Sequence, residues 1–115
     1  GRIDWRQPAE QINNLIRAVT HPFPGAFTSW RHKKIFLWSA TVDVDYTGPT
    51  LPPGKVWWNP QDKRMRIGTG DGVLLVRVAQ LENMAEATGE SLEQQIGFLD
   101  GEILDPGAIK LPPAK

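Results

Sequence analysis

Short apolar runs separated by turns rich in glycine and proline occupy residues 26–83, and they constrain the fold more than any other feature. The runs are AFTSW, KKIFLWSATVDV, KVWWN, RMRIGTG and VLLVRVAQLEN, and most are rich in β-branched and aromatic residues. Closely spaced short strands with turns of this kind are typical of small barrels and sandwiches. We therefore predict a domain built on five or six short strands.

The second run, which follows a polar RHKK turn, has no polar face. Ile35 and Leu37 alternate with Phe36, Trp38 and Ala40, so large apolar side chains point to both sides of the strand. We therefore expect this strand to be buried on both faces or to bend across a barrel.

A hairpin is predicted where Asp71 and Gly72 separate the last two runs. Both residue types tolerate a positive φ, which a two-residue hairpin turn requires. In the arm that follows, Leu74, Val76 and Val78 form a wholly apolar face. This face is expected to point into the core.

One amphipathic helix is predicted ahead of the strands, over about residues 8–19. Its apolar stripe has the spacing i, i+3, i+4 and i+7, and consists of Ile12, Leu15, Ile16 and Val19. Pro8 suits the first helical position, and Pro22 ends the helix. Asn13 falls off the stripe and is expected to lie outside the core.

A second, short helix is predicted over LEQQIGFL, residues 92–99. Ser91 and Gln94 have the spacing of a capping box, which would place the helix start at Ser91. The residues before it, ATGES, are expected to form a loop. We expect one domain over residues 1–104, with its barrel over about residues 26–104, and a proline-containing tail or linker over residues 105–115.

Composition excludes several classes of site and partner. The 115 residues contain no cysteine, which rules out disulfides and thiolate chemistry, and the formal net charge is zero. A dedicated nucleic-acid-binding domain is normally basic. No apolar run is long enough to span a membrane, and no signal peptide is recognisable, so we predict a cytoplasmic protein. The chain starts without an initiator Met, which suggests a piece of a longer protein.

Neither histidine has a catalytic arrangement nearby in the sequence. His21 follows the predicted helix, where it could interact with the helix dipole or face a ligand, and His32 lies in a basic turn. The alternating carboxylates Asp43 and Asp45 lack the glycine and glutamate of a calcium loop. No catalytic, cofactor-binding or metal-binding residue is therefore assigned.

Five tryptophans leave a nucleic-acid-binding face as an alternative function. Tryptophan beside lysine and arginine is typical of surfaces on which bases stack. Since adjacent residues of a strand point to opposite faces, Trp57 or Trp58 is expected to face outward. The candidate nucleic-acid face consists of Trp30, Arg31, Lys33, Lys34, Lys63, Arg64 and Arg66.

The N-terminal segment, residues 1–27, resembles the segment that opens the C-terminal domain of formyltransferases that use 10-formyltetrahydrofolate. The resemblance lies in GRIDW followed by QPAEQINNLIRAVTHPFPGAF, and IGTGDGVLLVRVAQLEN is similar to the final hairpin of that domain. The similar residues are Ile3, Asp4, Trp5, Gln7, Pro8, Ala9, Asn14, Ile16, Arg17, Ala18, Pro22, Pro24, Gly25 and Ala26.

The resemblance implies an all-β fold, a small open OB-like Greek-key barrel of five to six strands preceded by one amphipathic helix, with a short helix near the C-terminus. It also implies an upstream catalytic domain that binds 10-formyltetrahydrofolate and carries the catalytic Asn-His-Asp set. The chain itself would then hold no cofactor. The residues expected at the interdomain joint or the substrate cleft are Asp4, Trp5, His21, Pro22, Phe23, Pro24 and Gly25.

Two branches of that family are compatible with the motif. In methionyl-tRNA formyltransferase the corresponding loop typically begins Asn-Pro-Trp-Pro, and the domain is basic. RAVTHPFPGAF is more similar to enzymes that formylate an amino sugar nucleotide, such as the aminoarabinose formyltransferase. The zero net charge also weakens the tRNA interpretation, because phosphate contacts dominate nucleic-acid affinity. We favour an amino sugar nucleotide as the substrate and keep tRNA as the less favoured partner.

Overall fold

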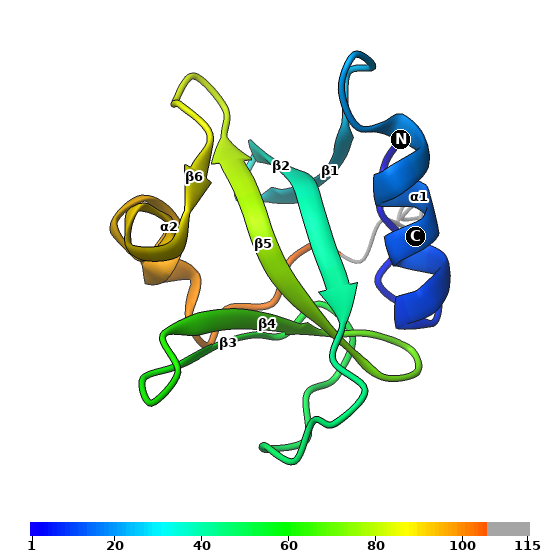
Figure 1. Ribbon diagram of the computed structural model, residues 1–115, viewed down its shortest axis with the longest axis vertical. Coiled ribbons are helices and arrows are strands. Elements are labelled where there is room, and N and C mark those ends of the chain that lie inside the picture. The colour runs from blue at the N-terminus through cyan, green and yellow to red at the C-terminus, as the bar shows by residue number, and fades with distance from the viewer. Residues whose placement is uncertain (106–115) are drawn as a thin grey trace, which may run out of the picture.

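The computed structural model describes residues 1–105 and contains a strongly curved antiparallel sheet between two helices (Figure 1). The predicted tail therefore lies, apart from Asp105, outside the described residues. In chain order the elements are helix α1 (Ala9–Val19), strands β1 (Ala26–Trp30), β2 (Lys33–Val42), β3 (Val56–Asn59), β4 (Arg64–Gly68), β5 (Val73–Leu81) and β6 (Ala87–Thr88), helix α2 (Gly89–Ile96) and a 3-10 turn, Gly97–Leu99.

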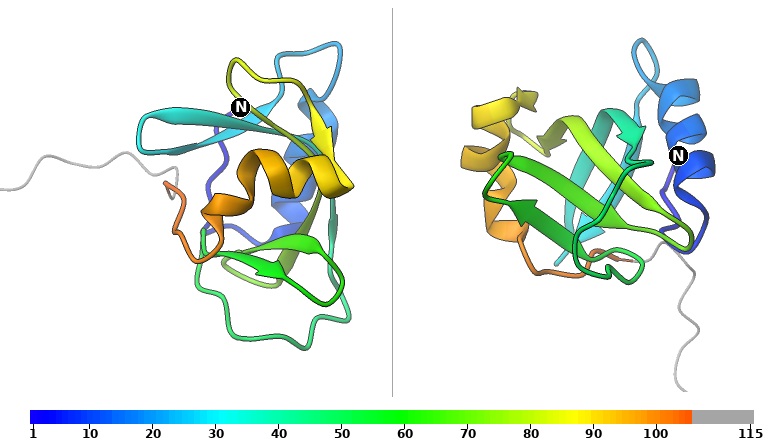
Figure 2. Two further views of the ribbon diagram at one scale, coloured as in Figure 1. Left: turned by 90° about the vertical axis from the view of Figure 1, so that its left-hand side faces the viewer. Right: turned by 60° about the horizontal axis from the view of Figure 1, so that its bottom comes forward.

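The strands form one six-stranded sheet in the order β1-β2-β5-β4-β3, with β6 also paired to β5. All the strand pairs are antiparallel. Strand β5 joins the β1–β2 pair to the β3–β4 pair, which cross at a steep angle, so the sheet curls into an open barrel (Figure 2). The predicted all-β class, with a leading helix and a short helix near the C-terminal end, is confirmed.

The core lies between the concave side of the sheet and the two helices. The stripe on α1 supplies Ile12 and Ile16, which are at most 1% exposed. The other large side chains of this cluster include Ile35, Leu37, Trp58, Met65, Ile67, Leu74, Val76, Leu92, Ile96, Leu99 and Leu104. Burial of apolar surface of this extent is the main favourable contribution to folding.

Two details of α1 differ from the sequence prediction. Pro8 is the N-cap, not the first helical residue, because it forms a bridge with Asp71 that keeps its backbone extended. Asn13 is buried, with its Oδ1 atom lacking a hydrogen-bond partner. The helix packs against β1, β2 and β5, so the face that it buries is wider than the apolar stripe.

The loop between β4 and β5 is longer than the predicted two-residue turn. Only Gly72 has a positive φ, +87°, and the loop comprises the four residues 69–72. The Thr69 hydroxyl accepts a 3.2 Å hydrogen bond from the Asp71 N–H, and the Ala9 N–H donates to the Asp71 carbonyl at 2.9 Å. The start of α1, which is hydrogen-bonded to this loop, therefore shapes its conformation. By contrast, the RHKK turn is shorter than predicted, because only Arg31 and His32 lie between β1 and β2.

A register shift in the β2–β5 ladder changes which residues face inward. Pairing is irregular between Leu37 and Ala40, so Ala40 joins the buried side with Leu37. On β5, Leu74 and Val76 face the core as predicted, but Ala79 takes the inward place expected for Val78. A bulge of this kind advances the inward-facing set by one residue.

The second helix begins three residues earlier than predicted. Thr88 is its N-cap and Ser91 is the third helical residue, so the capping box pairs Thr88 with Ser91. The Thr88 N–H donates to Ser91 Oγ at 3.0 Å. The predicted loop ATGES is therefore the short strand β6 followed by the first turn of α2.

Candidate functional site

The segment between α1 and β1 carries the exposed members of the predicted interdomain set. His21, Pro22, Phe23 and Pro24 are all exposed, and Phe23 is 58% exposed despite its size. The Phe23 N–H donates to the Thr20 carbonyl at 3.1 Å, which closes a turn directly after the helix. We call residues 21–24 the HPFP loop.

The start of the HPFP loop is held against strand β2. The His21 imidazole stacks on the Trp38 indole, with ring centroids 3.9 Å apart and planes inclined by 7°. The Thr20 hydroxyl donates to the Trp38 carbonyl at 3.1 Å. Stacking and hydrogen bonding together fix the start of the loop on β2.

Gly25 lets the chain pass over Trp38 after the loop. Its φ is +97°, and a Cβ at this position would lie 2.8 Å from the Trp38 ring. Glycine is therefore required both by the backbone conformation and by the close approach of the ring.

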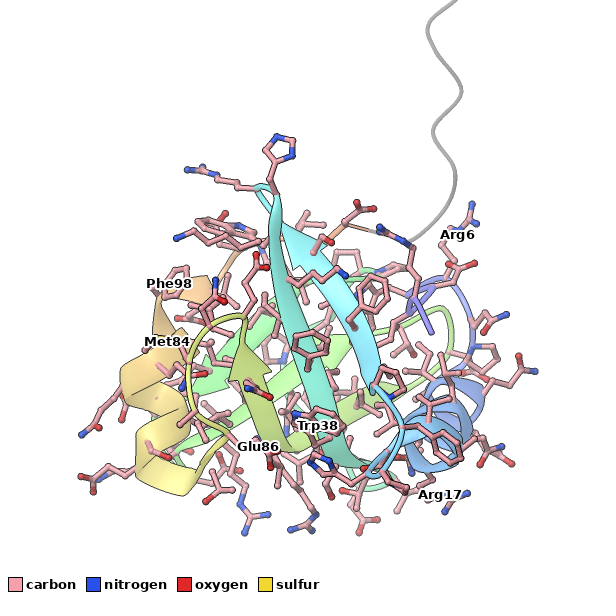
Figure 3. All side chains as sticks on the ribbon, turned by 90° about the horizontal axis from the view of Figure 1, so that it is seen from above. Arg6, Arg17, Trp38, Met84, Glu86 and Phe98 are labelled. Carbon is pink, nitrogen blue, oxygen red and sulfur yellow. The ribbon has the colours of Figure 1, made fainter. Side chains whose placement is uncertain are left out.

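Glu86, in the segment between β5 and β6, is the second partner of His21. Its carboxylate lies 2.7 Å from His21 Nε2. Figure 3 shows Trp38 between Glu86 on one side and the end of α1, near Arg17, on the other. Local sequence patterns did not reveal this partner, because 65 residues separate His21 from Glu86.

The two remaining candidates of the interdomain set differ in exposure. Trp5 has no exposed surface and donates from Nε1 to Thr28 Oγ1 at 2.8 Å, so it belongs to the core of this domain. Its fully buried ring therefore offers no surface to another domain. Asp4 is partly exposed, and the hydrogen bonds from the Arg6 guanidinium and backbone lower the pKa of its carboxyl.

The seven residues of the candidate nucleic-acid face divide between two hairpins. Trp30, Arg31, Lys33 and Lys34 belong to the β1–β2 hairpin, whereas Lys63, Arg64 and Arg66 belong to the β3–β4 hairpin. Strand β5 separates these hairpins in the sheet. Trp30 packs edge-on against Phe98 and donates from Nε1 to Glu102 at 3.0 Å.

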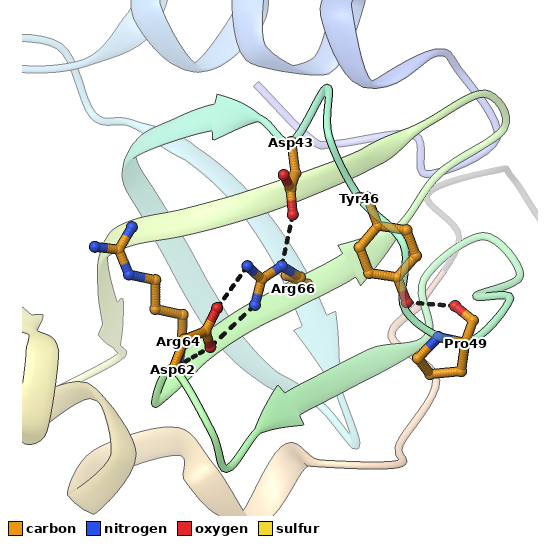
Figure 4. Close-up of polar contacts among 6 residues, drawn as sticks. All are labelled: Asp43, Tyr46, Pro49, Asp62, Arg64 and Arg66. Carbon is orange, nitrogen blue, oxygen red and sulfur yellow. Dashed lines mark hydrogen bonds and ion pairs between the residues drawn. The ribbon is translucent and has the colours of Figure 1, made fainter.

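Arg66 is engaged inside the domain (Figure 4). Its guanidinium binds Asp43 at 2.6 Å and Asp62 at 2.7 Å, and its side chain is only 12% exposed. The hydrogen bonds that Arg66 donates, first to Asp62 and then to Asp43, raise the pKa of Arg66, and those to Asp62 lower the pKa of Asp62. Burial raises the pKa of the neighbouring Tyr46, whose hydroxyl donates to the Pro49 carbonyl. The arrangement fastens the β2–β3 loop to the β3–β4 turn.

Two surface hollows flank β4. The first, about 750 Å³, lies beside α2 and is lined by residues of opposite charge, among them Arg64, Arg77, Glu90 and Glu93. The second, about 670 Å³, lies beside the Arg66 ion pairs. Over residues 1–105, no group of three or more histidine or acidic side chains has the geometry to hold a metal ion. Neither helix in the same range has the length and apolar character needed to cross a bilayer.

Comparison with protein families identifies the class of domain. The family model described as "Formyl transferase, C-terminal domain" matches residues 1–96. The chain belongs to this family. It is thus a formyltransferase-associated domain, and the structure extends the ordered part beyond the matched residues. Leu104 is 2% exposed, and its N–H donates to the Gly54 carbonyl at 2.9 Å.

Proposed function

We propose that this formyl transferase C-terminal domain belongs to an enzyme that transfers a formyl group from 10-formyltetrahydrofolate to the amine of an amino sugar nucleotide. The upstream N-terminal domain of the same protein would bind the folate and perform the chemistry. There the amine would attack the formyl carbon and a general base would take the amine proton, which would pass to the leaving nitrogen of tetrahydrofolate. The domain described here would shape one wall of the substrate cleft and pack against the catalytic domain.

The observation that carries this proposal is the exposure of the HPFP loop on a fixed base. Phe23 projects into solvent, while the residues on either side of the loop are held against Trp38. Two prolines restrict the loop further, so little conformational entropy is lost when another surface contacts it. A large apolar side chain on such a loop is suited to contact a substrate or the catalytic domain.

Charge distribution favours a sugar nucleotide over tRNA. Binding to nucleic acid depends on several cationic side chains that reach phosphates together. Here the candidate cations lie on two separate hairpins, and the ion pairs with Asp43 and Asp62 satisfy Arg66. A nucleotide-linked sugar carries only two phosphates and does not require an extended basic face. Methionyl-tRNA remains the alternative acceptor that the experiment must include.

The test is an acceptor panel with the full-length protein that carries this domain. The protein is incubated with 10-formyltetrahydrofolate and, separately, with UDP-linked and dTDP-linked amino sugars and with methionyl-tRNA, and the products are identified by mass spectrometry. We expect a formylated amino sugar. Formylation of methionyl-tRNA alone, or of no amino sugar in the panel, would overturn the proposal.

A matched pair of variants then tests the loop. Phe23→Ala removes the exposed ring and is expected to lower kcat/KM for the sugar about tenfold, the effect of roughly one well-formed apolar contact. Val44→Ala is the control, because Val44 is 84% exposed in the loop after β2, far along the chain from residues 21–24. Equal activity of the two variants would show that the loop does not line the substrate cleft.

A further inference from the structure

The outer face of the β1–β2 hairpin carries a row of aromatic rings. Phe27 on β1 lies directly opposite Phe36 on β2, and their ring centroids are 6.4 Å apart. Phe36 is followed by Trp38 at 6.0 Å, and His21 stacks on Trp38. We call Phe27, Phe36 and Trp38 the outer aromatic row.

The outer aromatic row departs from the normal pattern of an antiparallel sheet. Strands with one face in water usually place polar residues on that face. In β2 the inward residues Ile35 and Leu37 are fully buried, yet the outward Phe36 and Trp38 are as large and remain partly exposed. Large apolar side chains on both faces are typical of a strand that is buried on both sides. Within residues 1–105, however, only the inner face of β2 is fully buried.

Two cations lie over Phe27, at one end of the row. The Arg2 guanidinium is 5.2 Å from the centroid of the Phe27 ring, and Lys34 Nζ is 4.6 Å from it. These cation–π contacts place charged groups at the end of the row, next to the apolar rings of Phe36 and Trp38. An apolar centre with a polar rim is the composition of protein–protein interfaces.

The N-terminal end of the domain lies at the edge of the same hairpin. The Phe27 N–H donates to the Gly1 carbonyl at 3.0 Å, and Arg2 pairs with Phe27 in a parallel bridge. A chain that precedes Gly1 therefore arrives beside β1, next to the outer aromatic row. A domain tethered at this point has a high effective concentration over the row.

We infer that the outer aromatic row is the surface on which the preceding catalytic domain docks. This inference rests on the proposed function only in that it takes a catalytic domain to precede Gly1. It does not depend on which acceptor is formylated. The HPFP loop borders the row through the stack of His21 on Trp38, so docking would carry Phe23 to the edge of the interdomain cleft.

Photo-cross-linking from the centre of the row tests the inference. Phe36→p-benzoylphenylalanine keeps an aromatic ring at a partly exposed position of the full-length protein, and the cross-linked peptides are identified by mass spectrometry. We expect cross-links within one molecule to peptides of the catalytic domain. Val44→p-benzoylphenylalanine, at a highly exposed site, should give no such cross-link. Cross-links only to a second copy, only to RNA, or none at all would overturn the inference.

Hydrogen exchange provides a second measurement that does not depend on the cross-linking residue. Phe36→Glu in the full-length protein should raise the exchange rate of the cross-linked catalytic-domain peptides at least fivefold, whereas Val44→Glu should leave it unchanged. Exchange of residues 73–81, the core strand β5, should be the same in both variants, which shows that the barrel remains folded. Equal exchange of the catalytic domain in the two variants would contradict docking. If the acceptor panel fails but the cross-links form, only the proposed substrate is wrong.

Discussion

The His21 imidazole lies flat against the Trp38 indole, with 3.9 Å between ring centroids and 7° between ring planes. This stack joins His21, the second residue after α1, to the middle of β2. The Trp38 ring also fills the space beneath Gly25, where a Cβ would come within 2.8 Å of it. One indole thus supports both ends of the HPFP loop.

Removal of this indole is expected to destabilise the domain and free the loop. Trp38→Ala should lower the free energy of unfolding by about 2 kcal/mol, less than a fully buried tryptophan because the ring is partly exposed. Trp38→Phe should cost about half as much, since a ring remains but the hydrogen bond to Gln80 is lost. Urea unfolding measures both. An equal loss in the two variants would show that the hydrogen bond, not the ring, is what matters.

The contact between His21 and Glu86 should contribute much less than the stack. Both side chains are well exposed, 59% and 42%, so water screens the pair. Glu86→Ala is therefore expected to change the free energy of unfolding by no more than about 0.5 kcal/mol at pH 7. Urea unfolding under the conditions used for Trp38→Ala is the measurement. A loss as large as that of Trp38→Ala would make the contact between His21 and Glu86 the main support of the loop.

Local patterns predict the elements of this fold better than the contacts between them. The stripe with Ile12 and Ile16 predicts α1, since i, i+3, i+4 spacing suffices to identify one face. The inward place of Ala40 depends on a register shift against β5, which strand alternation cannot reveal. In the candidate site, the exposed prolines follow from the motif, but the burial of Trp5 and the contact with Glu86 arise from tertiary packing.

Asn13 is a site where a substitution should stabilise the domain. Its Oδ1 is buried without a hydrogen-bond partner, which costs roughly 1–3 kcal/mol relative to a satisfied group. Asn13→Ala removes this cost and raises helix propensity. We expect an increase in the free energy of unfolding of about 1 kcal/mol, measured by urea denaturation.

The matched control for this substitution is Asn14→Ala in the same helix. Asn14 is exposed, so its replacement changes helix propensity and an exposed hydrogen bond to Arg17 but no buried polar atom. The gain from Asn14→Ala should be about 0.5 kcal/mol or less. If the two variants are equally stable, the buried oxygen is satisfied in solution.

Arg66 should make the stability of the domain depend on pH in the acid range. Hydrogen bonding to Arg66 lowers the pKa of the folded Asp62 carboxyl below its ordinary value of 3.8. The unfolded chain therefore binds the proton more readily, so this stabilisation is complete above the unfolded pKa and is lost as pH falls through the folded pKa. Arg66→Met should lower the free energy of unfolding by about 2 kcal/mol at pH 7, because it leaves two carboxylates without their partner.

The pH profile separates this ion-pair cluster from the other carboxylates of the domain. Between about pH 5 and pH 2, the free energy of unfolding of Arg66→Met should fall less steeply than that of the wild type, since the largest cause of the lowered Asp62 pKa, the hydrogen bond from Arg66, is gone. Arg64→Met is the control, because Arg64 donates only its backbone N–H to Asp62, at 3.1 Å, and should keep most of the wild-type slope. Urea titrations at each pH give these slopes. Parallel profiles for the wild type and Arg66→Met would mean that the ion pairs of Arg66 add nothing to acid stability.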